Sequence, residues 1–327
     1  MYIESSQDDD QPLVSVCIVT YNHKRYIHDC IMSVIAQSSD VTLEILVGDD
    51  QSDDGTSGII EVLTKEYPHF IRNFRHLKRI GYGSKNYLYL LQKTRGTYIA
   101  HLDGDDYWLP GKLKAQVAFL EQNPTCSAVY TNALVIQENN EPAGIFNNPQ
   151  PTKFDINRLL GQGNFLNNSS MLYRASFKQS ILDFQAPFID YQINLSHALS
   201  GSLGYLNQAL TVYRLNSSSS VLVQANERIR KLYWDALLNL PRASVNTDAL
   251  ARGMSEFGRS VFFRSLRIKK ISLFKKWLPI VLNSSPVGKA KTIFFVLSAI
   301  FRVAAQEGLA SLSAKLGGNQ MKILYRR

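Results

Sequence analysis

The sequence predicts an α/β fold, with a doubly wound and mostly parallel sheet followed by a C-terminal helical extension. Two observations support this. Between residues 12 and 136, short apolar runs alternate with stretches whose apolar residues recur at helical spacing. From residue 224 onward, helical spacing continues without a strand pattern. Strands that alternate with helices form parallel sheets, in which ligands bind beyond the carboxyl ends of the strands.

The predicted elements follow one another in a regular order. Each expected strand is a short, nearly continuous apolar run: VSVCIVT, LEILVGDD, FIRNFRH, TYIAHL and SAVYTNALVI. Between them, apolar residues recur every three or four positions and predict helices. Ser52, Asp53 or Asp54 is expected to cap the helix that carries Ile59 and Leu63. After residue 137, a loop rich in Asn, Pro and Gly leads into mixed helices and strands.

The chain divides into three parts by composition. Residues 1–11 are polar and predict a flexible N-terminus, residues 12–223 form the α/β domain, and residues 224–327 form a basic helical region. The formal charge of +9 is unevenly distributed: residues 257–327 carry 14 Lys and Arg against the single acid Glu307. The rest of the chain carries 22 basic and 26 acidic residues, so the two parts meet different partners.

The remaining composition bounds the class of protein. A 45% hydrophobic content suits a globular protein with a sizeable core. Cys17, Cys30 and Cys126 lack metal-ligand spacing, and no leader pattern opens the chain, so a reducing, cytoplasmic setting is expected. The histidines lack zinc spacing, and neither a phosphate-binding P-loop nor a dinucleotide fingerprint is present.

Three acids in HLDGDDYWLP, which are Asp103, Asp105 and Asp106, follow an apolar strand. Neighbouring carboxylates repel one another unless a cation or hydrogen-bond donors compensate them. Mg²⁺ or Mn²⁺ prefers such oxygen ligands, completed by phosphate and water. Alternatively, Asp105 and Asp106 cap the helix that begins near Pro110.

Three motifs, which follow one another along the chain, favour the metal site over the helix cap. The series VSVCIVTYNHKRY, LEILVGDDQSDDGT and TYIAHLDGDDYWLP resembles the family 2 glycosyltransferases with the GT-A (Rossmann-like) fold, over about residues 12 to 220. The resemblance implies that residues 12–223 are a metal-dependent, inverting catalytic domain. It implies transfer of a sugar from a nucleoside diphosphate sugar, expected to be a UDP-sugar, to an acceptor hydroxyl.

The resemblance also implies roles for matching residues on the donor side. Asp103 and Asp105 match the metal-binding pair, and Asp106 supports their loop. Asp49, with Asp50 beside it, matches the acid that binds the nucleotide base. The other implied donor contacts are Thr20, Tyr21 and Asn22 after the first strand, Lys85 and Arg214 near the phosphates, and Asp103 itself. Alternatively, Asp49 belongs to a solvated turn, Tyr21 packs, Lys85 is solvated and Arg214 forms a structural ion pair.

On the acceptor side, Asp190 in PFIDYQ matches the general base that takes the acceptor proton. Ile189 replaces the family's usual first acid, and Asp190 could instead cap a helix. Asn164, Ser169 and Ser170, in GNFLNNSS, match residues that line the acceptor site.

The basic region mixes Lys and Arg with aromatic and aliphatic residues, a composition that suits peripheral contact with an anionic membrane. Its run TIFFVLSAIF has only ten residues, whereas a spanning helix needs roughly 20 apolar residues. The alternative is a helical subdomain that packs on the catalytic domain. No nucleic-acid partner is expected, because no binding motif accompanies the charge.

These patterns point to a lipid-linked or envelope glycan acceptor, with the enzyme at the inner face of the cell membrane. One rival function is a nucleotidyltransferase, which attacks the α-phosphate; TYNHKRY lacks the Gly-rich loop of that class. The other rival is a non-catalytic module that binds nucleotide sugars.

Overall fold

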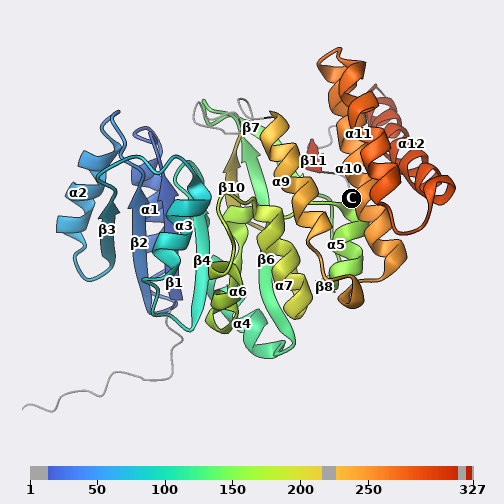
Figure 1. Ribbon diagram of the computed structural model, residues 1–327. Helices are drawn as coiled ribbons and strands as arrows, with labels where there is room; N and C mark the ends of the chain where they lie inside the picture. The colour runs from blue at the N-terminus through green and yellow to red at the C-terminus, as the bar shows by residue number, and fades with distance from the viewer. Residues whose placement is uncertain (1–13, 216–225, 316–321, 326–327) are drawn as a thin grey trace, which may run out of the picture.

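A computed structural model of the chain describes residues 14–215, 226–315 and 322–325 (Figure 1). The predicted flexible N-terminus 1–11 and the boundary at residues 223 and 224 lie outside these ranges. The strands are β1 (Val14–Thr20), β2 (Leu43–Asp49), β3 (Ile71–Arg75), β4 (Tyr98–Asp103), β5 (Tyr107–Trp108), β6 (Cys126–Ile136), β7 (Pro142–Asn147), β8 (Lys153–Phe154), β9 (Leu172–Arg174), β10 (Ser202–Arg214) and β11 (Ile323–Tyr325).

The helices of the first 214 residues are α1 (Ile27–Ile35), α2 (Thr56–Glu66), α3 (Gly83–Leu91), α4 (Lys112–Gln122), α5 (Ile156–Gln162), α6 (Lys178–Leu182) and α7 (Asp190–Ser200), with a short 3-10 turn η1 at Asn168–Ser170. The C-terminal helices are α9 (Asn226–Leu238), α10 (Thr247–Arg267), α11 (Ile271–Ser284) and α12 (Lys289–Lys315). The five strands predicted up to residue 136 and the helices between them are therefore confirmed.

The sheet has the order β11-β7-β6-β9-β4-β1-β2-β3, with β10 beside β6. Strands β1, β2, β3 and β4 run parallel, whereas β9 is antiparallel to both β4 and β6. This mixed, mostly parallel sheet confirms the predicted fold class. Thr20 pairs with Asp49, and Val19 pairs with Asp103, so the polar ends of β1, β2 and β4 meet at one edge.

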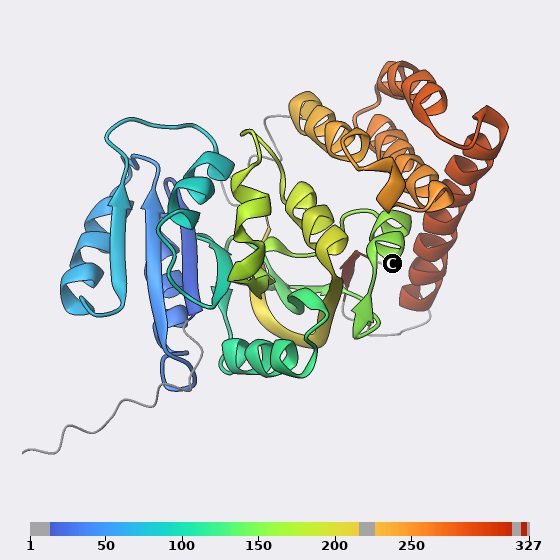
Figure 2. The same cartoon turned by 60° about the horizontal axis from the view of Figure 1, so that its bottom comes forward.

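Helices cover both faces of the sheet (Figures 1 and 2). Because side chains alternate along a strand, Val16 and Ile18 of β1 pack in one apolar cluster with residues of α1, α2 and α4. Cys17 and Val19 point to the opposite face and pack with residues of α3, α5 and α7. This two-sided burial explains why the strand runs are almost continuously apolar.

The second apolar cluster continues from the α/β domain into the C-terminal helices. Trp234 of α9 and Trp277 of α11 each lie 5.0 Å, between ring centroids, from Phe257 of α10. All three are buried. Helices α9, α10 and α11 therefore pack on the α/β domain, as the alternative prediction for this region stated. The short strand β11, which the sequence did not suggest, pairs with β7 at the sheet edge.

Helix α12 buries one face and exposes another. Phe295, Val296 and Ala299 are buried, whereas Phe294 and Phe301 are 65% and 75% exposed. Leu297, three residues after Phe294 and four before Phe301, lies on the same exposed side, and Ile293 lies four residues before Leu297. Within the described parts of the chain, no helix combines the length and apolarity that a membrane crossing requires.

Candidate active site

The candidate site lies where the carboxyl ends of β1, β2 and β4 converge. Thr20 is buried at the end of β1, with its Oγ1 3.1 Å from Nδ1 of His23. Gly104, which follows β4, approaches both side chains: a Cβ at this position would lie 2.7 Å from Thr20 Oγ1 and from His23 Nδ1. The glycine of DGDD is therefore required by the close approach of two loops.

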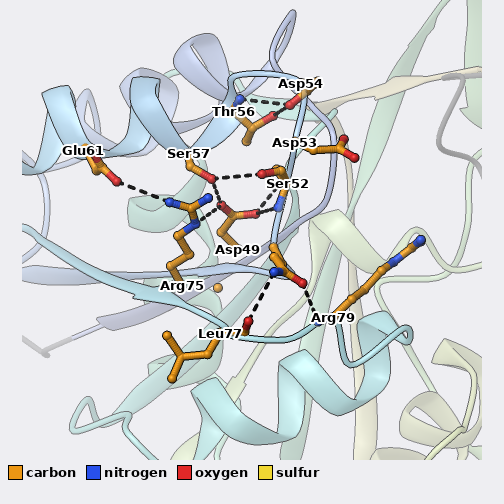
Figure 3. A network of polar contacts seen from close by, with 12 residues as sticks. Asp49, Ser52, Asp53, Asp54, Thr56, Ser57, Glu61, Arg75, Leu77 and Arg79 are labelled. Carbon is orange, nitrogen blue, oxygen red and sulfur yellow. Dashed lines mark hydrogen bonds and ion pairs between the residues drawn. The ribbon is translucent and has the colours of Figure 1, made fainter.

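Asp49 points into the loop that follows β2 (Figure 3). Its Oδ1 accepts hydrogen bonds from the backbone N–H of Ser52 (3.0 Å) and the Ser52 hydroxyl (2.5 Å), while Oδ2 accepts from the Ser57 hydroxyl. Arg75 Nε lies 4.0 Å from Oδ2. Asp49 is buried, so it organises this loop, and its contact with a nucleotide base stays a prediction.

Asp50 ties the loop before α3 to the sheet. Its two carboxylate oxygens accept hydrogen bonds from the backbone N–H groups of Ile80 (2.6 Å) and Gly81 (2.9 Å). Gln51 strengthens this connection: its amide donates to the Leu77 carbonyl and accepts from the Arg79 backbone N–H. Gln51 has a φ of 58°, a conformation that non-glycine residues adopt rarely.

Tyr21 and Asn22 lie beside that loop. The Arg79 guanidinium carbon stands 3.8 Å from the centroid of the Tyr21 ring, so Tyr21 presents a ring face rather than packing in the core. Asn22, with a φ of 56°, donates from its backbone N–H to the Ser52 hydroxyl at 2.9 Å. Its side-chain amide donates to the Asp53 carboxylate and accepts from the Asp53 backbone N–H. The first two loops are thus joined into one surface.

Lys85 lies at the outer edge of this surface. Its side chain is exposed, with Nζ 5.5 Å from the centroid of the Tyr82 ring. The adjacent Asn86 is buried and donates to the Gly48 carbonyl at 2.7 Å, which anchors α3 to the end of β2. The fold therefore positions the backbone at Lys85, and the predicted phosphate contact of its side chain stays a prediction.

Asp103 is held in its ionised form at the end of β4. His101 Nε2 lies 3.1 Å from Asp103 Oδ1, and the Ser169 hydroxyl donates to Oδ2 at 3.4 Å. Burial raises the pKa of Asp103, but His101, His23 and Ser169 outweigh it, so the net pKa lies below its usual value. With its side chain 41% exposed, Asp103 offers a charged oxygen to a ligand.

Asp106 lies in a different environment from Asp103. It is buried and accepts a hydrogen bond from the Arg214 backbone N–H at 2.9 Å. Burial raises its pKa well above the usual value, and repulsion from Asp105 and Asp103 raises it further, which favours the protonated form. A protonated Asp106 reduces the charge repulsion among the three acids. Asp106 supports the loop, while Asp103 and Asp105 remain partly exposed.

Arg214 holds the carboxylate loop from behind. It is 5% exposed, and it donates from Nε to the Asp105 carbonyl at 3.1 Å and from a guanidinium nitrogen to Asn140 Oδ1 at 2.6 Å. Its guanidinium carbon lies 4.3 Å from the Tyr26 ring centroid. These contacts give Arg214 a structural role, and its predicted phosphate contact stays a prediction.

Asp190 is the first residue of α7, and Ile189 holds the capping position. Its Oδ1 accepts from the Tyr191 backbone N–H at 2.8 Å, and its carboxyl group hydrogen-bonds with Asn164. Burial raises its pKa more than these bonds lower it, so the net pKa lies above the usual value. The Asp103 carboxylate raises that pKa further and His101 lowers it, although both are almost ninety positions away in the sequence.

The three acceptor-side residues occupy different places. Asn164 contacts Asp190, as described above. Ser169 is buried and bonded to Asp103, with its hydroxyl also accepting from the Asp103 backbone N–H at 3.2 Å. Ser170 is fully buried, and its hydroxyl donates to the Asn167 carbonyl at 2.7 Å. Their contact with an acceptor stays a prediction.

The sequence reasoning missed His101 and Trp108 as parts of this site. His101 and Asp103 are two residues apart on β4, so strand alternation places both side chains on one face, a signal that was available in the sequence. Trp108 Nε1 donates to the Ser169 carbonyl at 2.7 Å. This long-range bond helps to hold Ser169 against Asp103, and no sequence pattern indicates it.

Two acids of the site suit a divalent cation. Asp103 and Asp105 offer partly exposed carboxylate oxygens, the ligand type that Mg²⁺ and Mn²⁺ prefer. Across the described residues, no group of three or more His, Cys, Asp or Glu side chains is arranged to hold a metal. Two carboxylates would leave most coordination positions of such a cation to other ligands.

Comparisons with known proteins identify the family of the chain. Residues 15–181 match the family described as Glycosyl transferase family 2. The chain is 30% identical over 242 residues to the Escherichia coli UDP-Glc:alpha-D-GlcNAc-diphosphoundecaprenol beta-1,3-glucosyltransferase WfgD, covering 70% of this chain and 86% of WfgD. It is 29% identical over 294 residues to an uncharacterised Mycobacterium tuberculosis protein, covering 81% of this chain and 84% of that protein.

A solved structure has the same fold. S. aureus TarS 1-349, in complex with UDP-GlcNAc, superposes with a TM-score of 0.65 at 16% sequence identity. The superposition covers 88% of this chain and 89% of TarS 1-349.

Proposed function

The chain belongs to glycosyltransferase family 2, and from that premise we propose that it is a metal-dependent, inverting enzyme that transfers a sugar from a UDP-sugar to an acceptor hydroxyl. The observation that carries the proposal is that β1, β2 and β4 end at one edge of the sheet, where His101 and Ser169 contact Asp103. The lowered pKa of Asp103 and the raised pKa of Asp190 support it. Two carboxyls whose environments separate their pKa values suit two different roles.

Asp103 and Asp105 would hold a Mg²⁺ or Mn²⁺ ion, which would neutralise charge on the leaving diphosphate. His101 and Ser169 hold Asp103 ionised and oriented for this role. Tyr21 and the Asp49 to Asp50 turn are assigned to the nucleotide, because the loops that carry them converge beside Asp103. Asp106 and Arg214, joined by a hydrogen bond, support the loop that carries Asp105.

Asp190 is assigned as the general base. An ionised Asp190 takes the proton of the acceptor hydroxyl as that oxygen attacks the anomeric carbon, and the bond to the diphosphate breaks on the opposite side. A raised pKa makes Asp190 a stronger base than an ordinary aspartate. A single displacement of this kind inverts the anomeric configuration.

The relatives support the choice of substrates. WfgD is named for a UDP-glucose donor and a diphosphoundecaprenol-linked acceptor, and TarS 1-349 was solved with UDP-GlcNAc. We therefore propose a UDP-sugar donor and a lipid-linked glycan acceptor for this chain, with a role in the synthesis of bacterial envelope polysaccharide.

Two rival functions predict different chemistry. A nucleotidyltransferase cleaves between the α- and β-phosphates of a nucleoside triphosphate, and the β1 loop here offers no glycine to cradle that chain. A binding module releases no product at all. Asp190 distinguishes both rivals from a glycosyltransferase, since neither needs a base for an acceptor hydroxyl.

The test is donor turnover by the full chain with UDP-, GDP-, CDP- and dTDP-sugars, with Mn²⁺ or with EDTA. We expect release of UDP that requires the cation, loss of turnover in Asp105→Ala and Asp190→Asn, and wild-type turnover in Asp183→Asn, a matched change at an exposed aspartate. With a lipid-linked acceptor, proton NMR should show an inverted anomer. Turnover unaffected by EDTA, a retained configuration, or release of pyrophosphate from a nucleoside triphosphate would contradict the proposal.

We further propose that α12 contacts an anionic membrane from the cytoplasmic side. Four large apolar residues of this helix, Ile293, Phe294, Leu297 and Phe301, are between 43% and 75% exposed. They lie in the segment with 14 basic residues against one acid, which suits an anionic lipid surface. Trp277 of α11, in contrast, is buried and unavailable for this contact.

Vesicle sedimentation tests this surface. The wild type should bind phosphatidylglycerol vesicles and bind neutral phosphatidylcholine vesicles weakly, and Phe294→Ser/Phe301→Ser should lose most binding. The control Val62→Ser/Leu199→Ser alters exposed apolar residues outside the C-terminal helices and should bind normally. If the α12 variant binds vesicles as the wild type does, the proposed membrane surface is contradicted. If the substitutions in α12 instead convert a dimer into a monomer, the exposed face of α12 joins two copies of the chain.

A further inference from the structure

Helix α9 reaches the candidate base through Tyr233. The Tyr233 ring stacks on Tyr191, with centroids 4.4 Å apart and planes 20° from parallel. Tyr191 directly follows Asp190, and its backbone N–H donates to the Asp190 carboxylate. The C-terminal region therefore packs against the residue next to the base rather than at a distance from the site.

The Tyr233 hydroxyl makes a second contact with this region. It accepts a hydrogen bond from the Asn164 backbone N–H at 3.1 Å. The preceding Gly163 has a φ of 74°, a left-handed conformation that glycine adopts without strain. This turn presents the Asn164 N–H to α9, so Tyr233 fixes the backbone of a residue whose side chain hydrogen-bonds with Asp190.

A buried chain of hydrogen bonds sets the direction of the Asn164 amide. The Tyr130 hydroxyl donates to Asn194 Oδ1 at 2.7 Å, which leaves Asn194 Nδ2 to donate to Asn164 Oδ1 at 3.0 Å. An amide whose oxygen accepts in this way turns its NH₂ group to other partners. Asn164 therefore donates to the Asp190 carboxyl, an interaction that favours the ionised base.

We infer that Tyr233 is a positioning residue for Asp190, acting through Asn164, so that the C-terminal helical region completes the catalytic site. The inference rests on the proposed role of Asp190 as general base. It assigns α9 a part in catalysis that is separate from any membrane contact of α12.

The test compares Tyr233→Phe, which keeps the ring stack and removes the hydroxyl, with the wild type. We expect kcat to fall roughly tenfold, because base orientation governs the chemical step, with donor KM nearly unchanged. Losing the Asn164 donor raises the pKa of Asp190, so the acid limb of the kcat profile should move to higher pH. Asn164→Ala should show the same shift, and the double variant should be no worse than Asn164→Ala alone.

Tyr205→Phe is the matched control, because its buried hydroxyl accepts a hydrogen bond from Asn147 outside the site. It should change the melting temperature without moving the pH profile. Should Tyr233→Phe and Asn164→Ala keep the wild-type kcat and profile while Asp190→Asn is inactive, the inference fails and the proposed function stands. An active Asp190→Asn would instead overturn the proposed base.

Discussion

His101 Nε2 lies 3.1 Å from Oδ1 of Asp103, and both side chains project from the same face of β4. The His101 ring also packs edge-on against Tyr87, with centroids 4.7 Å apart. One buried histidine thus sets the charge and direction of the carboxylate assigned to the metal.

His101→Phe should keep the ring contact and lose the hydrogen bond, so we expect turnover to fall about tenfold at a fixed Mn²⁺ concentration. Without this partner, the pKa of Asp103 should rise. A depressed pKa contributes stability that is present above the unfolded value and lost as pH falls through the folded value. Acid unfolding, followed by circular dichroism in EDTA, should therefore begin at higher pH. His101→Gln retains a donor, and equal defects in both variants would contradict this account.

Asp106→Asn should keep the hydrogen bond that supports the loop while removing the charge that Asp106 can carry. The raised pKa of Asp106 means that its stabilising contribution is present below the unfolded pKa and is lost as pH rises through the folded pKa. An asparagine oxygen can still accept from the Arg214 N–H, and it carries no charge. Melting temperatures of the metal-free protein should therefore decline less between pH 5 and pH 9 in the variant, as measured by differential scanning fluorimetry. A steeper decline than in the wild type would refute the assignment.

Gly104→Ala should disrupt the junction between β1 and the carboxylate loop. The added Cβ would meet Thr20 and His23 at 2.7 Å, and overpacking of this kind costs about 1–3 kcal/mol. We expect this loss of unfolding free energy in urea, together with loss of turnover. Gly58→Ala is the control, because nothing lies within 4 Å of its Cβ on α2, and it should stabilise by about 0.5–1 kcal/mol. Similar effects of the two changes would count against the packing argument.

Phe257→Ala should destabilise the whole chain. Phe257 is buried between Trp234 and Trp277 in the apolar cluster that α10 shares with the α/β domain. Truncation of a buried phenylalanine costs about 3–5 kcal/mol. Urea unfolding monitored by tryptophan fluorescence and by circular dichroism should give one coincident transition, shifted to lower urea. Phe294→Ala, at an exposed position, should leave it unchanged; two separate transitions would show independent domains.

The local patterns predicted much of the fold. Apolar runs such as VSVCIVT and the helical spacing of Ile27, Ile31 and Val34 depend on neighbours in sequence, and all became the expected elements. The acids at the ends of β2 and β4 were also placed at one edge of the sheet, because parallel strands bring their carboxyl ends together. The strand β11 was missed, since three residues carry too little pattern to reveal a partner at β7.

The basic region shows that composition does not predict which apolar residues are buried. Trp277 and Phe274 are interleaved with basic residues in sequence, yet Trp277 is buried, and Phe274 packs against the core shared with the catalytic domain. Composition records which residues are apolar, but it does not say which neighbour covers them. That depends on how α9 packs on α7 and how α10 packs on α5, α11 and α12.

By itself, the sequence determined the order of strands and helices, the family and the identity of the acids, because each depends on short-range patterns. Only the tertiary structure decided the surroundings of each acid. Asp103 has a lowered pKa beside His101. Asp106 is buried beside Arg214 and has a raised pKa, and the pKa of Asp190, beside Asn164, is also raised. The physical reason is that a carboxyl group's pKa depends on burial and on nearby charges and donors, and those neighbours are brought together by long-range packing.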